Sequence, residues 1–171
     1  MNKSQIKLII TDIDGVWTDG GMYYDQTGNE WKKFNTSDSW GVWIFKQLGI
    51  PIAIMTGENT EIVARRATKL NIDHLFMGVK DKLQAAKELA SKLEITLTEV
   101  AFIGDDLNDY LLLNQVGFSA VPSNAPKYLK DDRDFVTCTP GGKGAFREFA
   151  EHIANLIDPE FNILQLIKRE E

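Results

Sequence analysis

The sequence predicts an α/β fold built on a doubly wound parallel sheet. Three short apolar segments, residues 7–11, 51–55 and 100–103, each end at small or acidic residues, and segments with helical periodicity lie between them. Short runs of consecutive apolar residues are typical of strands that are buried on both faces. Strands that alternate with helices indicate βαβ units, and therefore a parallel sheet.

The segments between these strands have the periodicity of amphipathic helices. The first places Trp40 and Trp43 on one face and ends at Gly49, a residue type common just after a helix. The second covers residues 60–70 and the third covers residues 81–93, each with apolar side chains at spacings of three and four.

One segment interrupts this alternation directly after the first strand. Two stretches rich in aromatic residues flank the turn Gln26-Thr27-Gly28, which predicts a β-hairpin over about residues 20–34. The C-terminal tail, about residues 158–171, has Pro159 at a first-turn position and predicts a final helix. We expect a single domain over residues 1–171.

Composition and charge exclude several classes of function. The chain has 171 residues, with 19 lysines and arginines against 25 aspartates and glutamates, which gives a net charge of −6. This acidic balance argues against nucleic-acid binding. No apolar run approaches the roughly 20 residues that span a bilayer, and no apolar segment of a secretory signal follows the N-terminus. Cys138 is the only cysteine, so an intramolecular disulfide is excluded. We expect a cytoplasmic protein.

Polar side chains follow the predicted strands at the point where each strand ends. Asp12 and Asp14 come after the first strand, Thr56 after the second and Asp105 after the third. Because the carboxyl ends of parallel strands meet at one edge of a sheet, these side chains should lie close together. Clustered carboxylates raise one another's pKa, and a divalent cation relieves this repulsion. Hard oxygen ligands favour Mg²⁺ over zinc.

A site of this kind suits a phosphate group. Thr56 offers a hydroxyl and a backbone N–H beside Gly57, where we expect a helix N-terminus that favours anions. A carboxylate can attack phosphorus and form an aspartyl-phosphate, which divides one difficult step into two. For Asp106 taken alone, a role as a loop or capping residue is the alternative.

Four motifs together resemble those of the haloacid dehalogenase (HAD) phosphohydrolases over about residues 6 to 150. They are, in order, residues 12–20 (DIDGVWTDG), Thr56-Gly57, Lys82, and residues 104–109 (GDDLND). A single Asp-x-Asp motif would be weak evidence for this family, whereas four motifs in the same order are specific for it. The resemblance implies a Rossmann-like HAD fold and Mg²⁺-dependent hydrolysis of a phosphomonoester through an aspartyl-phosphate.

The resemblance also implies roles for single residues. Asp12 is the nucleophile and a Mg²⁺ ligand, and Asp105 is a further ligand. Asp14 is the acid/base, which protonates the leaving alcohol and then activates water, and its backbone carbonyl is a metal ligand. Thr56, Gly57 and Lys82 hold the transferring phosphoryl group.

Two more acids of the fourth motif are expected to support these residues without contacting the phosphoryl group. Asp109 orients Lys82 or a metal-bound water, and Asp106 supports the metal. Lys80 competes for the lysine role. We prefer Lys82, because it opens the predicted helix after the strand-like residues 75–77.

The chain leaves no room for the cap domain that covers many HAD sites. The hairpin carries aromatic and apolar residues that are common at protein interfaces: Met22, Tyr23, Tyr24 and Trp31. The alternative is that they pack on their own domain. The chain resembles the capless HAD branch that dephosphorylates 2-keto-3-deoxy sugar acids, which implies a homotetramer. In that assembly the hairpin and C-terminal tail of one subunit close the neighbouring site. Residues 141–148 resemble that branch's glycine-rich loop and following helix.

The residue after Thr56-Gly57 bears on the substrate. Octulosonate phosphatases of this branch usually have arginine there, whereas this chain has Glu58. The hairpin and Glu58 look more like the nononate phosphatases, which favours KDN 9-phosphate over the alternatives, KDO 8-phosphate and N-acylneuraminate 9-phosphate. Arg66 and Lys69 are candidates to receive the sugar carboxylate; a solvated helix face is the alternative for both.

Two other classes of protein remain to be weighed. A phospho-receiver domain also joins acids, a threonine and a lysine around Mg²⁺, but its acidic pair is usually adjacent rather than Asp-x-Asp. A HAD domain kept only for oligomerisation would be marked by loss of Asp12 or Asp14, and both are present.

Overall fold

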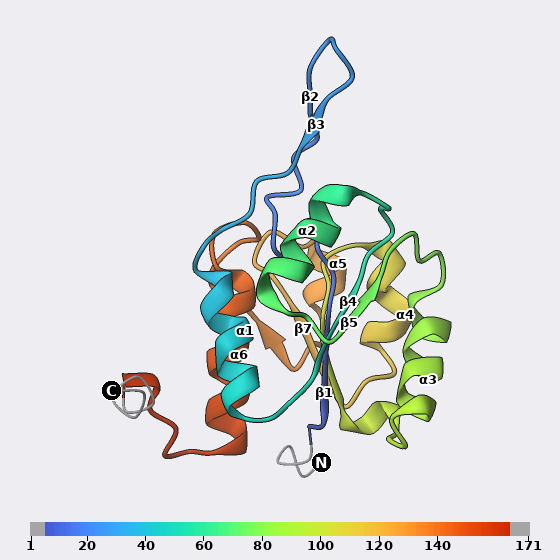
Figure 1. Cartoon of the computed structure of the whole chain (residues 1–171). Coiled ribbons are helices and arrows are strands. Elements are labelled where there is room, and N and C mark those ends of the chain that lie inside the picture. Colours follow the sequence, from blue (N-terminus) through green and yellow to red (C-terminus); the bar gives the residue numbers. More distant parts are fainter. Residues whose placement is uncertain (1–5, 165–171) are drawn as a thin grey trace.

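A six-stranded sheet lies between two layers of helices in the computed structural model, which describes residues 6–164 (Figure 1). The strands of this sheet are β1 (Leu8–Thr11), β4 (Ile52–Met55), β5 (His74–Phe76), β6 (Val100–Ile103), β7 (Phe118–Val121) and β8 (Phe135–Val136). Their order is β5-β4-β1-β6-β7-β8, and every neighbouring pair is parallel. The predicted α/β fold with a parallel sheet is confirmed.

Strand β1 occupies the centre of the sheet, between β4 and β6. Ile10 is the register partner of Ala53 on one side and of Phe102 on the other. The chain therefore continues to opposite sides of β1, and the carboxyl ends of β1, β4 and β6 lie next to one another. This is the place where open α/β sheets bind their ligands.

Each face of the sheet is covered by its own set of helices. One face carries α1 (Asp38–Gln47), α2 (Glu61–Leu70) and α6 (Ala145–Ile157), and the other carries α3 (Lys82–Lys92), α4 (Tyr110–Leu113) and α5 (Lys127–Lys130). Alternate residues of each strand serve the two cores: Ile9 joins the first cluster, while Leu8 and Ile10 join the second.

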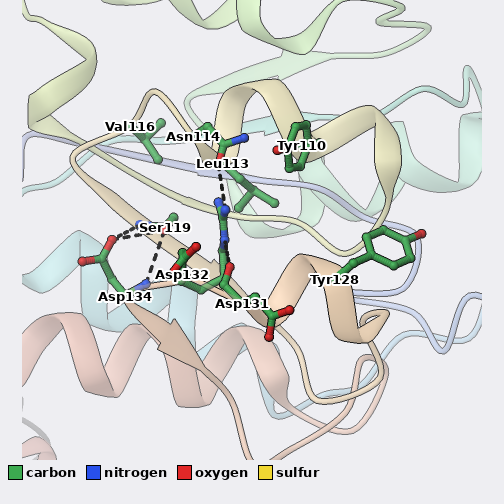
Figure 2. A pocket seen from close by; sticks show the side chains of 10 residues that line it. Tyr110, Leu113, Asn114, Val116, Ser119, Tyr128, Asp131, Asp132 and Asp134 are labelled. Carbon is green, nitrogen blue, oxygen red and sulfur yellow. Dashed lines mark hydrogen bonds between the residues drawn. The ribbon is translucent and has the colours of Figure 1, made fainter.

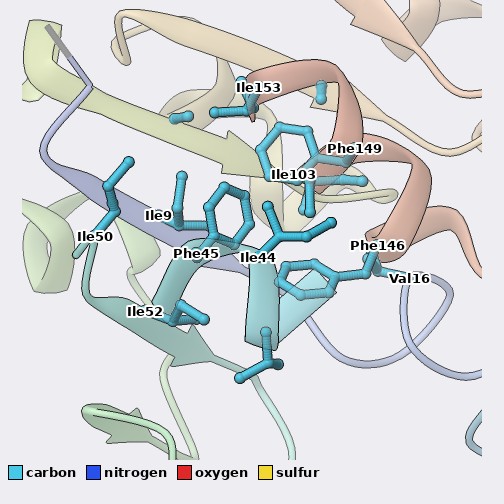
Figure 3. Packing of buried hydrophobic residues seen from close by; sticks show 14 of the residues in the cluster. Ile9, Val16, Ile44, Phe45, Ile50, Ile52, Ile103, Phe146, Phe149 and Ile153 are labelled. Carbon is cyan, nitrogen blue, oxygen red and sulfur yellow. The ribbon is translucent and has the colours of Figure 1, made fainter. Parts of the chain in front are cut away.

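Aromatic rings join α1 and α6 over the first face (Figure 3). Phe146 lies with its ring centroid 4.4 Å from that of Trp17 and 5.9 Å from that of Phe45. Full burial of such a ring is worth about 1.5–3 kcal/mol. This packing holds α6 against the loop that follows β1.

The hairpin extends away from the body of the protein (Figure 1). It consists of β2 (Tyr23–Tyr24) and β3 (Glu30–Trp31), paired antiparallel, within the predicted range of residues 20–34. Its apolar side chains are exposed: Met22 by 56%, Tyr24 by 62% and Trp31 by 51%. These residues therefore do not pack on their own domain.

The C-terminal tail differs from the prediction where it is described. A helix does not begin at Pro159, because residues 158–161 form a turn in which the Phe161 N–H donates to Asp158 O (2.9 Å). Helical conformation starts at Ile163, and the rest of the predicted tail helix lies outside the described residues. Among the described helices, none is long and apolar enough to cross a membrane.

Candidate active site

Asp12 begins the site at the end of β1. Its N–H donates to Ile103 O (3.0 Å), so the chain is still held to β6 where the carboxylate emerges, and Asp12 is 4% exposed. A tight turn follows, in which the N–H groups of Val16, Trp17 and Thr18 all donate to Ile13 O. Asp14 lies within this turn, and its Oδ1 accepts a hydrogen bond from the Thr18 hydroxyl (3.3 Å).

Lys82, at the first position of α3, is buried between two carboxylates. Its Nζ lies 2.9 Å from Asp12 Oδ2 and 2.6 Å from Asp109 Oδ1. The preceding residue, Asp81, caps the helix by accepting from the Gln84 N–H (2.9 Å). The competing lysine, Lys80, is exposed.

Asp109 fixes the loop that follows β6. Its Oδ2 accepts the N–H groups of Asp105 (2.9 Å) and Asp106 (3.2 Å), while its Oδ1 holds Lys82. Asp106 is exposed and caps the short 3₁₀ helix η3 (Leu107–Asp109), since its Oδ1 accepts from the Leu107 N–H (2.7 Å). The structure thus gives Asp106 a capping contact and gives Asp109 the contact to Lys82 expected of it.

Thr56 follows β4 and is buried, whereas Gly57 and Glu58 are exposed. The Thr56 hydroxyl accepts from the Glu58 N–H (3.3 Å). The helix N-terminus is not at Gly57 itself but lies where the helix predicted over residues 60–70 begins. Helix α2 begins at Glu61, because Thr60 has an extended backbone (φ −128°, ψ 139°) and serves as its N-cap.

Negative charge exceeds positive charge in this cluster. Burial, reinforced by the charge of Asp109 and opposed by Lys82, raises the pKa of Asp12 to about 7. Burial, followed by Asp12 and Asp109, raises the pKa of Asp105 to about 8. Burial alone would lower the pKa of Lys82, but the carboxylates of Asp12 and Asp109 outweigh it and raise the pKa. A bound cation would relieve this excess of buried carboxylates.

The donor atoms fit a hard divalent cation. One oxygen each of Asp12, Asp105 and Asp109 lie within 4.8 Å of one another. Both oxygens of Asp109 already have partners, whereas Asp12 Oδ1 is buried without any hydrogen bond. Asp12 and Asp105 are therefore the carboxylates free to ligate, and oxygen-only donors suit Mg²⁺.

Two contacts near this cluster were not foreseen from the sequence. Lys32, from the base of the hairpin, places Nζ 2.6 Å from Asp14 Oδ1. Asn124 donates to Gly15 O (3.1 Å) and accepts from the Gly141 N–H (2.6 Å), so the glycine-rich loop braces the turn after β1. Neither contact has a local signal, because the partners lie far apart along the chain.

The proposed specificity residues lie away from the buried acids. The Arg66 guanidinium donates through Nη2 to Asn35 O (3.2 Å) and Ser39 Oγ (3.1 Å). Arg66 and the exposed Lys69 line a surface groove of about 700 Å³ beside Phe34. Asp12, Thr56 and Lys82 are not among its lining residues.

A further polar pocket of about 320 Å³ lies between α4 and α5 (Figure 2). The polar side chains that line this pocket form hydrogen bonds within it. Arg133 Nη2 donates to Asn114 Oδ1 (2.6 Å), and the Ser119 N–H donates to Asp134 Oδ2 (3.0 Å). The acids that cluster around Lys82 do not line it.

A parallel α/β sheet that carries buried carboxylates and a lysine at its central switch point has the architecture of a metal-assisted phosphoryl-transfer enzyme. Comparisons with known proteins give the family. Residues 78–145 match the family described as haloacid dehalogenase-like hydrolase. The 3-deoxy-D-manno-octulosonate 8-phosphate phosphatase of Yersinia pestis is 39% identical over 150 residues, which are 88% of this chain and 80% of the relative.

Solved structures of similar proteins point to the same family. The octulosonate 8-phosphate phosphatase from Moraxella catarrhalis, in complex with magnesium, phosphate and KDO, superposes with a TM-score of 0.91 at 36% identity, covering 99% of this chain and 96% of that one. The cobalt-bound enzyme from Haemophilus influenzae gives 0.88 at 35%, covering 96% and 98%. The chain belongs to the HAD superfamily, in the capless branch that contains these enzymes. It is a HAD-type phosphatase, a hydrolase of phosphoric monoesters.

Proposed function

We propose that this phosphatase acts with Mg²⁺ on the phosphate ester of a 2-keto-3-deoxy sugar acid, and that KDO 8-phosphate is its first candidate substrate. The observation that carries the proposal is the buried cluster in which Lys82 holds Asp12 while Asp12 Oδ1 stays without a partner. The similarity to octulosonate phosphatases over most of the chain supports the choice of substrate.

The chain's own residues divide the work of the reaction. An Asp12 oxygen attacks phosphorus, the bond from phosphorus to the sugar oxygen breaks, and Asp14 donates a proton to the departing alkoxide. Water then attacks the phosphorus of the aspartyl-phosphate and gives a proton to Asp14. The bond between phosphorus and the Asp12 oxygen breaks, which frees the Asp12 carboxylate and inorganic phosphate. Lys82, Thr56 and the Gly57 N–H bind the phosphoryl oxygens. Asp12, Asp105 and the Asp14 backbone carbonyl would hold Mg²⁺, which would supply further charge compensation for those oxygens.

A second candidate substrate is KDN 9-phosphate, and Glu58 favours it. The Glu58 carboxylate is exposed directly after Thr56 and Gly57, where it would meet the sugar rather than the phosphate. An acid at this position repels a sugar carboxylate and instead accepts hydrogen bonds from hydroxyl groups. In this proposal the sugar extends from the phosphate site to the groove beside Phe34, where Arg66 and Lys69 bind its carboxylate.

The test is Mg²⁺-dependent phosphate release from KDO 8-phosphate, KDN 9-phosphate and N-acylneuraminate 9-phosphate at matched concentrations. Preference for KDO 8-phosphate supports the first candidate, and preference for a nine-carbon substrate supports the second. Asp12→Asn should abolish release from all three. Glu58→Arg should shift preference toward KDO 8-phosphate. If none of the three substrates releases phosphate, the proposal of a sugar acid phosphate substrate is wrong.

We also propose that the enzyme works as a cytoplasmic homotetramer, in which the hairpin and C-terminal tail of one subunit close the site of the next. Among residues 6–164 the intervals between the motifs hold, apart from the strands of the sheet and one short 3₁₀ helix, only the hairpin and single helices, so a lone chain has no cap there to exclude water. The exposed Met22, Tyr24 and Trp31 support a subunit contact at the hairpin.

A further inference from the structure

A buried lysine at the base of the hairpin contacts the proposed acid/base. Lys32 directly follows β3, and its side chain is only 2% exposed, whereas the next side chain, Lys33, is 57% exposed. Burying an ammonium group is costly unless it is paired. The burial of this charged side chain, beside an exposed lysine in the same hairpin, therefore calls for a specific partner.

The partner is one oxygen of Asp14. Lys32 Nζ lies 2.6 Å from Asp14 Oδ1, at the short end of charge-assisted hydrogen bonds. The Glu30 carboxylate, at 3.9 Å, is a weaker neighbour. Thr18 Oγ1 also donates to Asp14 Oδ1 (3.3 Å). Two donors thus converge on the same oxygen.

The other carboxylate oxygen of Asp14, Oδ2, is unpaired among the described residues. Asp14 Oδ2 is shielded from solvent and has no hydrogen-bond partner among the described residues. An oxygen that faces an ammonium group and a hydroxyl donor is a poor place for an added proton, because the proton would point at other donors. The free oxygen has no such conflict.

We propose that Lys32 is a positioning residue for phosphate ester hydrolysis. It fixes Asp14 Oδ1, so that Asp14 Oδ2 is the oxygen that gives a proton to the leaving alkoxide and takes one from water. This inference rests on the proposed acid/base role of Asp14. It ties the geometry of proton transfer to the placement of the hairpin, since Lys32 is a residue of the hairpin base.

The experiment compares two leaving groups in one set of variants. A primary alkyl phosphate, such as KDO 8-phosphate or glycerol 1-phosphate, needs a proton on its departing oxygen, whereas p-nitrophenolate leaves without one. The value of kcat/KM covers the steps up to transfer to Asp12. Loss of proton donation should therefore lower kcat/KM for the alkyl ester and spare p-nitrophenyl phosphate.

For Lys32→Met we expect kcat/KM to fall by about 10²-fold on the alkyl phosphate, the lower end of general acid catalysis, and by less than about threefold on p-nitrophenyl phosphate. Lys32→Arg, which keeps a charged donor, should restore most of the alkyl activity. The matched control is Lys33→Met, which removes an exposed lysine from the same hairpin and should change neither value.

Equal losses on both substrates would assign Lys32 a purely structural role, and unchanged alkyl activity would remove its role altogether; either result overturns the inference. If Lys32→Met does not fold, Lys32→Gln is compared in the same way. Failure of the proposed sugar acid specificity is a separate outcome, because it would be seen in the wild-type enzyme while the alkyl-to-aryl comparison still applies with glycerol 1-phosphate.

Discussion

Gly15 and Asp105 meet so closely that a β-carbon on Gly15 would lie 1.8 Å from Asp105 Oδ2. Gly15 also has a φ of +78°, a conformation that L-residues with side chains rarely adopt. The glycine therefore serves two purposes: it allows the turn after Asp14 and leaves space for a carboxylate that comes from β6. The spacing of the two acidic motifs depends on this missing side chain.

Gly15→Ala should therefore impair metal binding beyond its cost in stability. The methyl group must displace the Asp105 carboxylate, so we expect Mg²⁺ affinity to fall by about 10-fold or more, as when a ligand's support is lost. Isothermal titration with Mg²⁺ measures this. Gly49→Ala is the matched control, since Gly49 has a φ of +68° and no atom near the added β-carbon. Equal Mg²⁺ affinity in the two variants would contradict the steric argument.

Removing the charge of Lys82 should destabilise the protein strongly. Lys82→Met leaves the carboxylates of Asp12 and Asp109 buried without their cation, and breaking a buried ion pair costs about 3–5 kcal/mol. Chemical denaturation without metal gives the free energy of unfolding. Lys80→Met, at an exposed lysine, should change it by less than about 0.5 kcal/mol. A loss of similar size in both variants would show that burial of Lys82 is not the cause.

Mg²⁺ binding should release protons near neutral pH. In the metal-free protein the pKa of Asp12 is raised to about 7 and that of Asp105 to about 8, chiefly by burial. A ligating carboxylate must be deprotonated, so affinity should rise as the pH increases from 6 to 8 and level off above that. Calorimetry in buffers of different ionisation enthalpy would detect the released protons. Affinity that does not change between pH 6 and 9 would refute this linkage.

Asp38 predicts a pH effect on stability away from the metal site. Burial raises its pKa to about 6 from 3.8, opposed by the Arg147 N–H and the charge of Arg66. The folded state thus binds more protons than the unfolded state between these values. Stability from this group is greatest below pH 4 and is lost as the pH rises through 6. Asp38→Asn keeps an oxygen acceptor for the Arg147 N–H and should remove this dependence.

The size of the Asp38 effect follows from the pKa shift. Relative to wild type, Asp38→Asn should gain on the order of 2 kcal/mol in unfolding free energy between pH 4 and pH 7. Urea denaturation of both proteins across this range measures the difference, in which the other titrating groups cancel. A constant difference would mean that Asp38 does not carry the raised pKa.

The hairpin should determine assembly. Replacing Tyr24 and Trp31 together by serine removes two exposed aromatic side chains, and we expect a smaller particle in light scattering together with reduced phosphatase activity. Tyr128→Ser, at a residue of α5 that is 54% exposed, is the control and should leave the mass unchanged. An unaltered, active assembly in the hairpin variant would refute closure by the neighbouring subunit.

The central strands could be predicted from sequence because both of their faces are buried. β1, β4 and β6 consist almost entirely of consecutive apolar residues, and a residue of the site follows each strand within two positions. β7 and β8 were missed for identifiable reasons. β7 contains Ser119, whose hydroxyl is satisfied by Asp134, and β8 has only two residues. Tertiary contacts define these strands more than local sequence does.

The residues of the acidic site could be predicted from the order of the four motifs. The contacts that hold these residues in place could not. Asp12, Lys82 and Asp109 meet where the motifs implied. The contact between Lys32 and Asp14 depends on the orientation of the hairpin relative to the sheet, which sequence periodicity does not predict. The same holds for the distance from Gly57 to the start of helix α2, whose N-cap position is Thr60.

The bracing of the first motif by Asn124 and the glycine-rich loop has a consequence for biosynthesis. Gly141 passes so near the first turn that its β-carbon would lie 1.8 Å from Gly15 O, and the Gly142 N–H donates to Val16 O (3.2 Å). All four motifs leave the ribosome before this loop does. A nascent chain that ends before Gly142 thus already has every motif, but lacks the contacts that hold the first turn. The first turn can therefore gain this support only after residue 142 has been synthesised.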